Sequence, residues 1–270
     1  MSEHDAAPPP RFPPAVAALL EGSGGAGEST LVWAFAPGRT TWRLRRPGGE
    51  VWYLKVAPAG ASPSLADEAV RMRWLGPRLV VPRVLGQGQD GGQEWLLTAA
   101  VDGTSAVDPA LRADPERLVP LLAEGLRRFH RLPWRECPFD SRLDRVLETV
   151  REHLRDGRGD PECVLQRHGG RTAAEALRYL ETVRPPAEDL VVCHGDYCVP
   201  NVLVRGWRIA GFVDLGAVGV ADRWRDLGIA LWSVTRNLGP GWEDRFLEAY
   251  GVPRDPQRLA YYVLLYDLLP

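Results

Sequence analysis

The hydrophobic positions of the first hundred residues form short runs between glycine- and proline-rich turns. Runs of this length, rich in β-branched and aromatic residues, predict antiparallel strands joined by tight connections. The first three runs are followed by a further hairpin around the turn QDGGQ. The predicted strands are 31–35, 41–46 and 51–57, and the hairpin covers 82–85 and 94–99. We therefore expect an N-terminal antiparallel sheet.

A helix is predicted between these strands, beginning at the capping pattern Ser64-Leu65-Ala66-Asp67 and running to about Leu75. Glu68 falls on the apolar stripe of this helix, and a carboxylate among apolar neighbours needs a partner. Lys55 on the preceding strand is the economical partner. A Glu68 side chain that reaches solvent from the edge of the stripe stays an alternative.

From Asp114 onward the hydrophobic period becomes helical. Asp114-Pro115 combines an N-cap with a proline at the first helical position, and an apolar face continues to Phe129. Further helical patterns cover 141–156, 171–183, 223–236, 242–250 and 256–268. The expected organisation is a mobile tail over 1–14, an N-terminal lobe over 15–100 and a mainly helical C-terminal lobe over 101–270, with a hinge at Thr98–Gly103.

Composition narrows the class of protein. The chain is 45% hydrophobic and 25% charged, with a net charge of −2, which is ordinary for a globular protein and gives no reason to expect nucleic acid or a membrane surface as partner. Neither a membrane span nor a signal peptide is recognisable, so a cytoplasmic protein is expected. The cysteines are too few and scattered for a disulfide framework and are expected to be reduced thiols. They are Cys137, Cys163, Cys193 and Cys198.

Lys55 is unusual in this chain. Of the 33 basic residues, 32 are arginine and Lys55 is the exception. A compact ammonium group can sit between phosphate oxygens and a carboxylate, which a planar guanidinium does not do as well. Lys55 is therefore a candidate phosphate contact, although an arginine bias also allows a stray lysine.

Three oxygen-bearing side chains follow two apolar runs in the stretch 191–216. Asp196 lies in His-Gly-Asp, Asn201 comes five residues later, and Asp214 begins Asp-Leu-Gly. The spacing H-x-D-x-x-x-x-N, then D-x-G, is typical of the catalytic and metal loops of kinases. A predicted hairpin over 202–213 brings Asn201 and Asp214 to the same end, where both can bind Mg²⁺ on ATP, while Asp196 accepts the proton of an attacking hydroxyl.

Other interpretations of this stretch remain. Asp and Asn also favour turns and caps, and Cys193 and Cys198 with His194 between them raise a zinc site, although a second ligand pair at structural-zinc spacing is lacking. Downstream, Asp222 is expected to cap a helix, and Asp226 is expected to brace the catalytic loop by hydrogen bonds.

The N-terminal part offers weaker nucleotide contacts. The connection Pro37-Gly38-Arg39-Thr40 is compatible with a turn that cradles phosphate near Thr40, although a plain hairpin is the simpler interpretation. Backbone groups at Thr98 and Ala100, where the last strand meets the hinge, are candidates for binding adenine.

Four segments together resemble one family, the aminoglycoside O-phosphotransferases, especially the 3′ and 3″ types. They are RFHRLPWRECPFDSRL, HGDYCVPN, FVDLGAVGVADRWRDLGIAL and AYYVLLYDLLP. The resemblance implies an α+β, two-lobed protein-kinase-like fold that uses ATP and Mg²⁺. By motif position Asp196 would be the catalytic base, Asn201 and Asp214 the metal ligands, and Lys55 the phosphate contact, with Glu68 as its partner.

The resemblance also implies the acceptor, an aminoglycoside-like small molecule; a monomer or weak dimer is expected. Asp267 is the candidate C-terminal substrate contact. Acids between residues 140 and 162, among them Asp160 and Glu162, could bind a polycation, although a solvated helix face explains them at least as well. The chain has Ala217 where the 3′ enzymes usually carry arginine, and Tyr266-Asp267 in place of a pair of acids. Another small-molecule alcohol as acceptor and a nucleotide-binding pseudoenzyme are the alternatives. A protein kinase is disfavoured because no activation segment or A-P-E motif follows Asp214.

Overall fold

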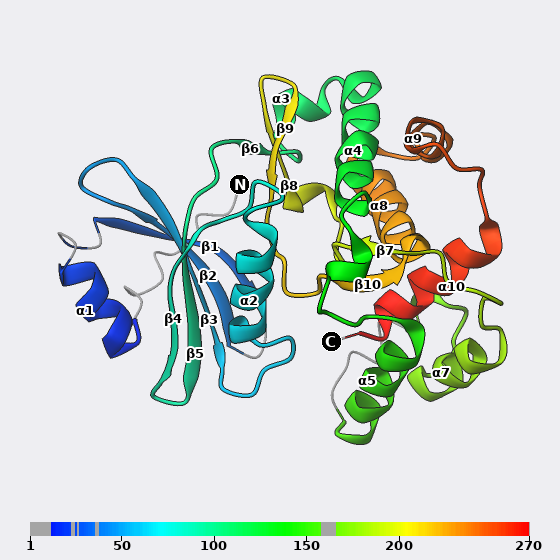
Figure 1. Cartoon of the computed structure of the whole chain (residues 1–270), viewed down its shortest axis with the longest axis horizontal. Coiled ribbons are helices and arrows are strands. Elements are labelled where there is room, and N and C mark those ends of the chain that lie inside the picture. Colours follow the sequence, from blue (N-terminus) through cyan, green and yellow to red (C-terminus); the bar gives the residue numbers. More distant parts are fainter. Residues whose placement is uncertain (1–11, 23–24, 26, 36–37, 158–165, 270) are drawn as a thin grey trace. The chain divides into compact units, whose positions relative to one another are not determined.

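The computed structural model describes residues 12–22, 25, 27–35, 38–157 and 166–269. It divides into two compact units (Figure 1). The first contains the chain up to Gly76 together with Pro82–Ala100, and the second contains Pro77–Val81 and the chain from Val101 onward. The predicted tail lies mostly outside the described residues. Of the helices that are described, none is both long enough and apolar enough to cross a lipid bilayer.

The first unit contains a five-stranded antiparallel sheet in the order β1-β2-β3-β5-β4. Its strands confirm the predicted runs, but β2 begins at Arg39, so Thr40 lies in a strand, paired with Val56, and not in the turn where we expected it. The elements are α1 (Pro14–Gly22), β1 (Glu28–Phe35), β2 (Arg39–Arg45), β3 (Val51–Pro58), α2 (Leu65–Leu75), β4 (Val84–Asp90) and β5 (Gln93–Ala99).

The core of this unit lies between the sheet and α1. Leu44 and Leu54 on neighbouring strands are fully buried, and Val16 and Leu20 of α1 belong to the same cluster. Helix α2 begins at the predicted cap, because Ser64 Oγ accepts the backbone N–H of Asp67 at 3.0 Å. Leu54 is the neighbour of Lys55 on β3, so its burial in this core fixes the backbone at Lys55.

The second unit is mainly helical, and its helices lie close to the predicted ranges. Asp114 and Asp222 cap α4 and α8 as expected, with their carboxylates accepting the N–H groups of Arg117 and Trp224. In Figure 1, α10 runs alongside α8. The helices are α3 (Pro109–Arg112), α4 (Pro115–His130), η1 (Trp134–Glu136), α5 (Leu143–Arg155), α7 (Ala173–Thr182), η2 (Val199–Asn201), α8 (Arg223–Leu238), α9 (Glu243–Tyr250) and α10 (Pro256–Asp267).

Two small sheets hold the catalytic stretch of this unit. The predicted hairpin is present as β8 and β9, with β6 added at one edge. The second sheet, in which Cys193 of β7 pairs with Gly219 of β10, was not predicted from the sequence. The strands are β6 (Thr104–Ser105), β7 (Leu190–Cys193), β8 (Val202–Arg205), β9 (Arg208–Phe212) and β10 (Gly219–Asp222).

Candidate active site

The catalytic loop begins where buried strand β7 ends, and it turns at Gly195. This glycine has φ of 85°, a left-handed conformation that glycine adopts without steric cost. A Cβ atom at the same position would lie 2.2 Å from Ala217 O. The close approach of these two backbones therefore requires glycine between His194 and Asp196.

Asp226, in the first turn of α8, braces this loop as expected. Its Oδ2 accepts the N–H of His194 at 2.6 Å, and its Oδ1 accepts that of Gly195 at 2.8 Å. His130 Nε2 lies 3.0 Å from the same Oδ2. Burial alone would raise the pKa of Asp226, but the hydrogen bond from His130 and the other donors outweigh burial and hold this pKa below its ordinary value. The buried carboxylate is therefore ionised and fixes the backbone of the loop.

His194 joins the catalytic loop to the strand that ends at Asp214. Its Nε2 donates to Val213 O at 3.1 Å, and its Nδ1 accepts the N–H of Asp196 at 3.3 Å. The imidazole is fully buried and lies against the rings of Phe129 and Phe212. It therefore ties Asp196 and Asp214 to one framework and is inaccessible to a substrate.

Three donors surround the carboxylate of Asp196. Cys198 Sγ and Tyr266 OH both donate to Oδ1, each at 3.0 Å. Asn201 Nδ2 donates to Oδ2, also at 3.0 Å. Burial, followed by the charge of Asp196, raises the pKa of both Cys198 and Tyr266, so the thiol and the phenol stay protonated donors. The carboxylate is thus held in one orientation from three sides.

Asn201 and Asp214 lie at adjacent strand ends, because Val213 N donates to Asn201 O at 3.0 Å. Asn201 Nδ2 donates to Asp196 O as well as to its carboxylate, which turns the amide oxygen away from Asp196. Asp214 is exposed and has φ of 62°, a strained conformation for a residue other than glycine. One amide oxygen and one exposed carboxylate are a donor set that suits Mg²⁺ with water and phosphate completing its shell.

The thiols have partners of their own. Cys193 Sγ donates to Asp222 O at 3.3 Å, and Cys198 donates to Asp196. Among the described residues, the group of potential metal ligands within 4.8 Å of one another is His130, Cys193 and Asp226. The hydrogen bonds of Asp226 to the loop already account for that group, so the zinc interpretation of the Cys193 and Cys198 pair gains no support.

The first unit contains the predicted lysine–glutamate pair. Lys55 Nζ on β3 lies 2.6 Å from Glu68 Oε1 on α2. The Glu68 side chain is 4% exposed and that of Lys55 is 24% exposed, so the glutamate is buried while the lysine side chain is partly accessible. The alternative in which Glu68 reaches solvent is therefore wrong.

The other candidate nucleotide contacts of this unit lie in its strands or directly after one. Thr40 Oγ1 accepts the indole N–H of Trp42 at 3.1 Å. Thr98 is buried within β5, and its hydroxyl donates to Tyr53 O at 3.4 Å. The N–H of Ala100 donates to Val51 O at 2.9 Å, so adenine would have to share or displace this bond.

The predicted substrate carboxylate, Asp267, is engaged inside its own unit. Arg167 Nη1 and His168 Nε2 each lie 2.7 Å from its oxygens, and its side chain is 4% exposed. A substrate ammonium would compete with the guanidinium of Arg167 and the imidazole of His168. The other two candidates, Asp160 and Glu162, lie outside the described residues.

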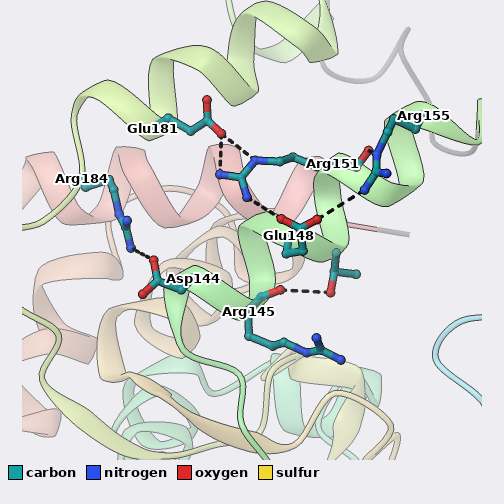
Figure 2. Close-up of polar contacts among 8 residues, drawn as sticks. Asp144, Arg145, Glu148, Arg151, Arg155, Glu181 and Arg184 are labelled. Carbon is teal, nitrogen blue, oxygen red and sulfur yellow. Dashed lines mark hydrogen bonds and ion pairs between the residues drawn. The ribbon is translucent and has the colours of Figure 1, made fainter.

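The acids of the helical region around α5 are also paired with arginines (Figure 2). Arg151 bridges Glu148 and Glu181, with nitrogen–oxygen distances of 2.7 and 2.6 Å. Asp144 lies 2.7 Å from a guanidinium nitrogen of Arg184. Just before α5, the bidentate contact with Arg142 lowers the pKa of Asp140 to about 2. Much of the acidity that could bind a polycation is thus neutralised within the protein.

Sequence reasoning missed two parts of this site. No local pattern indicates the role of His130, which is buried between Asp226 and Tyr250, with its Nδ1 2.7 Å from the phenol oxygen. Tyr266 was noticed only as a departure from the family pattern. Its spacing from Asp196 along the chain is too long for any local signal to indicate their contact.

Comparisons with known proteins identify the family and the fold. Residues 36–262 match the model of the phosphotransferase enzyme family. The aminoglycoside 3′-phosphotransferase of Streptomyces fradiae is 38% identical over 224 residues, which cover 79% of this chain and 84% of that protein. A crystal structure of an aminoglycoside-3′-phosphotransferase of type VIII is 34% identical, with a TM-score of 0.85 over 93% of this chain and 97% of that one.

A structure of aminoglycoside phosphotransferase APH(3″)-Id from Streptomyces rimosus ATCC10970, in complex with ADP and streptomycin, is also similar. It is 28% identical, with a TM-score of 0.78, and the match covers 94% of this chain and 97% of that one. The fold is therefore the kinase-like α+β fold of these enzymes. The chain belongs to the phosphotransferase enzyme family, together with the aminoglycoside phosphotransferases to which it is similar.

Proposed function

We propose that this protein transfers the γ-phosphoryl group of ATP to a hydroxyl of an aminoglycoside and thereby confers resistance. The observation that carries the proposal is the arrangement around Asp196. Its carboxylate is held by three donors at the end of a buried strand, beside an amide and a carboxylate suited to Mg²⁺. Phosphoryl transfer relies on such positioning and on electrostatic stabilisation more than on covalent chemistry.

In this proposal Asp196 orients the acceptor hydroxyl and accepts its proton. General-base assistance of this kind is commonly worth about 10²- to 10⁴-fold in rate. Asn201 and Asp214 would hold the metal ion, which, when bound, neutralises charge on the phosphate oxygens. Lys55, kept in place by Glu68, would contact the phosphates of ATP from the first unit. Thr40, Thr98 and Ala100 remain candidate contacts for the nucleotide.

The relatives support ATP and an aminoglycoside as the two substrates. The similar Streptomyces rimosus structure contains ADP and streptomycin. ATP use also favours action in the cytoplasm, which we propose as the location of the protein. We further propose that it acts as a monomer or weak dimer. The charge of −2 gives no reason to add a nucleic acid or membrane partner.

The decisive experiment is a screen of ATP consumption with Mg²⁺ over kanamycin, neomycin, streptomycin, a macrolide and simple amino alcohols. We expect ADP release to depend on an aminoglycoside, and mass spectrometry to find that aminoglycoside phosphorylated. If only the macrolide or the amino alcohols are turned over, the proposed aminoglycoside acceptor is wrong and the acceptor belongs to that other class. Nucleotide binding without turnover of any acceptor would favour a pseudoenzyme.

A second acceptor class, small-molecule alcohols with fewer positive charges, is favoured by one observation. The carboxylate of Asp267 is already engaged by side chains of the protein. The family resemblance implies a pair of acids at this place, whereas this chain has Tyr266-Asp267, and Asp267 contacts Arg167 and His168. An acceptor alcohol with fewer positive charges would not need this carboxylate. The same screen separates the two classes by comparing KM across acceptors of increasing charge.

A further inference from the structure

Tyr266 lies in direct contact with the proposed catalytic base. Its phenol oxygen is 3.0 Å from Asp196 Oδ1, and its side chain extends from α10, 70 residues further along the chain. The ring also lies near Trp232 of α8, with ring centroids 6.2 Å apart. Packing on α8 therefore holds the phenol where it meets the carboxylate.

The two oxygens of Asp196 are used unequally. An ionised carboxylate oxygen has two lone-pair directions. Oδ1 accepts hydrogen bonds from both Tyr266 and Cys198, which fills its capacity, whereas Oδ2 accepts one from Asn201. The remaining direction for an incoming hydroxyl is therefore on Oδ2, the oxygen nearer to the amide of the proposed metal ligand.

We propose that Tyr266 is a positioning residue for phosphoryl transfer, which together with Cys198 closes Oδ1 of Asp196 and directs the attacking hydroxyl to Oδ2. The proposal rests on the proposed function and adds a specificity device to it. Closing Oδ1 leaves the base a single productive orientation. It also denies that oxygen to water, the competing nucleophile.

Water competes by a balanced reaction. A water oxygen forms a bond to the γ-phosphorus, the bond from that phosphorus to the bridging oxygen of ADP breaks, and a water proton passes to Asp196 and then to solvent. The products are ADP and inorganic phosphate. With Oδ1 opened, water gains a second position on the base in addition to that on Oδ2, and this hydrolysis should increase.

The test is Tyr266→Phe, which removes the phenol oxygen and keeps the ring. Its matched control is Tyr261→Phe on the same helix. The hydroxyl of Tyr261 is buried, and among the described residues it has no hydrogen-bond partner. Both variants lose one hydroxyl from α10, but only the first opens Oδ1. Cys198→Ala opens the same oxygen from the other side.

Two rates are measured for the wild type and each variant with Mg²⁺-ATP: release of inorganic phosphate without acceptor, and phosphorylation of the acceptor. For Tyr266→Phe we expect acceptor-independent hydrolysis to rise roughly three- to tenfold, which is the effect of about one hydrogen bond. Transfer to the acceptor should fall through kcat, while KM for ATP stays unchanged. Cys198→Ala should move both rates in the same direction, and Tyr261→Phe should move neither.

Equal hydrolysis rates in the wild type, Tyr266→Phe and Cys198→Ala would overturn the proposal, even if the wild type phosphorylates an aminoglycoside readily. Because hydrolysis is measured without acceptor, the Tyr266 proposal is tested independently of the acceptor's identity. If the wild type turns over no aminoglycoside while hydrolysis rises in both variants, the proposed acceptor is wrong and the role of Tyr266 stands. A hydrolysis increase in Tyr261→Phe equal to that in Tyr266→Phe would assign the effect to general loosening of α10 and overturn the proposal.

Discussion

Oδ2 of Asp226 lies 2.6 Å from the backbone nitrogen of His194, so the first turn of α8 holds the start of the catalytic loop. Asp226→Asn should weaken this hold, since an amide nitrogen would then face a backbone N–H or the imidazole of His130. Loss of a buried, hydrogen-bonded charge costs about 3 kcal/mol of unfolding free energy. We expect that loss in urea denaturation and a fall in kcat larger than any change in nucleotide affinity.

The control for this variant is Asp244→Asn, the same chemical change at an exposed ion pair. The Asp244 side chain is 83% exposed beside Arg254, and such exposed pairs contribute roughly 0 to 1 kcal/mol. An Asp226→Asn protein as stable and as active as Asp244→Asn would show that the loop does not depend on this carboxylate.

Asp196→Ala should abolish turnover and spare nucleotide binding, because the nucleotide contacts that we propose lie on other residues. The expected loss in kcat is about 10²- to 10⁴-fold, the usual contribution of a general base. Steady-state kinetics and a direct ATP-binding titration measure the two effects separately. Wild-type kcat in this variant, with the true acceptor, would remove Asp196 from the mechanism.

Lys55→Met should affect both stability and activity, because it leaves the buried carboxylate of Glu68 without the ammonium that lies 2.6 Å away. Removing one partner of a buried pair costs about 3 kcal/mol. Adding Glu68→Gln to Lys55→Met removes the buried charge and should recover much of the stability. Activity should not recover, since the proposed phosphate contact is still missing.

Calorimetry and KM for ATP distinguish these two contributions. If the double variant regains activity along with stability, the role of Lys55 is structural alone. If Lys55→Met unfolds too readily to assay, the double variant still tests the phosphate contact.

Glu94 should make unfolding free energy depend on pH. Its side chain is buried, its Oε2 accepts the N–H of Leu65, and burial is the largest cause of its raised pKa. A raised carboxyl pKa means that the folded protein binds the proton more tightly than the unfolded chain does. The resulting stability is present below the ordinary pKa of 4.5 and is lost as pH rises through the folded-state pKa.

Glu94→Gln removes this titration and keeps an oxygen for Leu65. The stability of the variant relative to wild type should therefore increase between pH 4 and pH 7, by urea denaturation at both values. Glu50→Gln, the same chemical change at an exposed position of the same unit, is the control. A difference that shrinks as pH rises would reverse the sign assigned to Glu94.

Arg167→Ala should increase the affinity for acceptors with several ammonium groups. The substitution removes a guanidinium 2.7 Å from Asp267 and exposes a carboxylate that is otherwise covered. One ion pair of this kind is worth roughly 1 kcal/mol, or about a fivefold lower KM. Arg171→Ala is the control. Arg171 lies over the ring of Tyr179 and is not one of the two side chains described above as contacting Asp267. An unchanged KM in Arg167→Ala would mean that Asp267 is not a substrate contact.

Most secondary structure was predictable from the sequence because its signals are local. Asp114 and Asp222 cap helices where a capping side chain precedes an apolar period, and the strands of the first unit lie between turn-forming residues. Strand β10 was missed because Gly219–Asp222 is short and leads directly into α8. Its identity depends on pairing with β7, which is remote in the sequence.

The candidate site also contains residues with local sequence signals and a contact that depends on tertiary packing. Asp196, Asn201 and Asp214 could be proposed as candidates because their spacing along the chain is fixed by one loop and one hairpin. The Lys55–Glu68 pair was found because an inward-facing charge on a helix requires a partner. The contact between Tyr266 and Asp196 depends on how α10 packs on α8. The hydrophobic pattern of the sequence does not predict that packing.

The five residues Pro77–Val81 belong to the second unit although they interrupt the first. Val80 O accepts the N–H of Phe212 at 3.1 Å, next to Gly211, where a Cβ atom would approach this carbonyl to 2.7 Å. A chimera that joins two family members at residue 100 would therefore combine the Val80 of one parent with the Gly211 strand of the other. Recombination that preserves the hairpin between the proposed metal ligands should transfer 77–81 and 101–270 together.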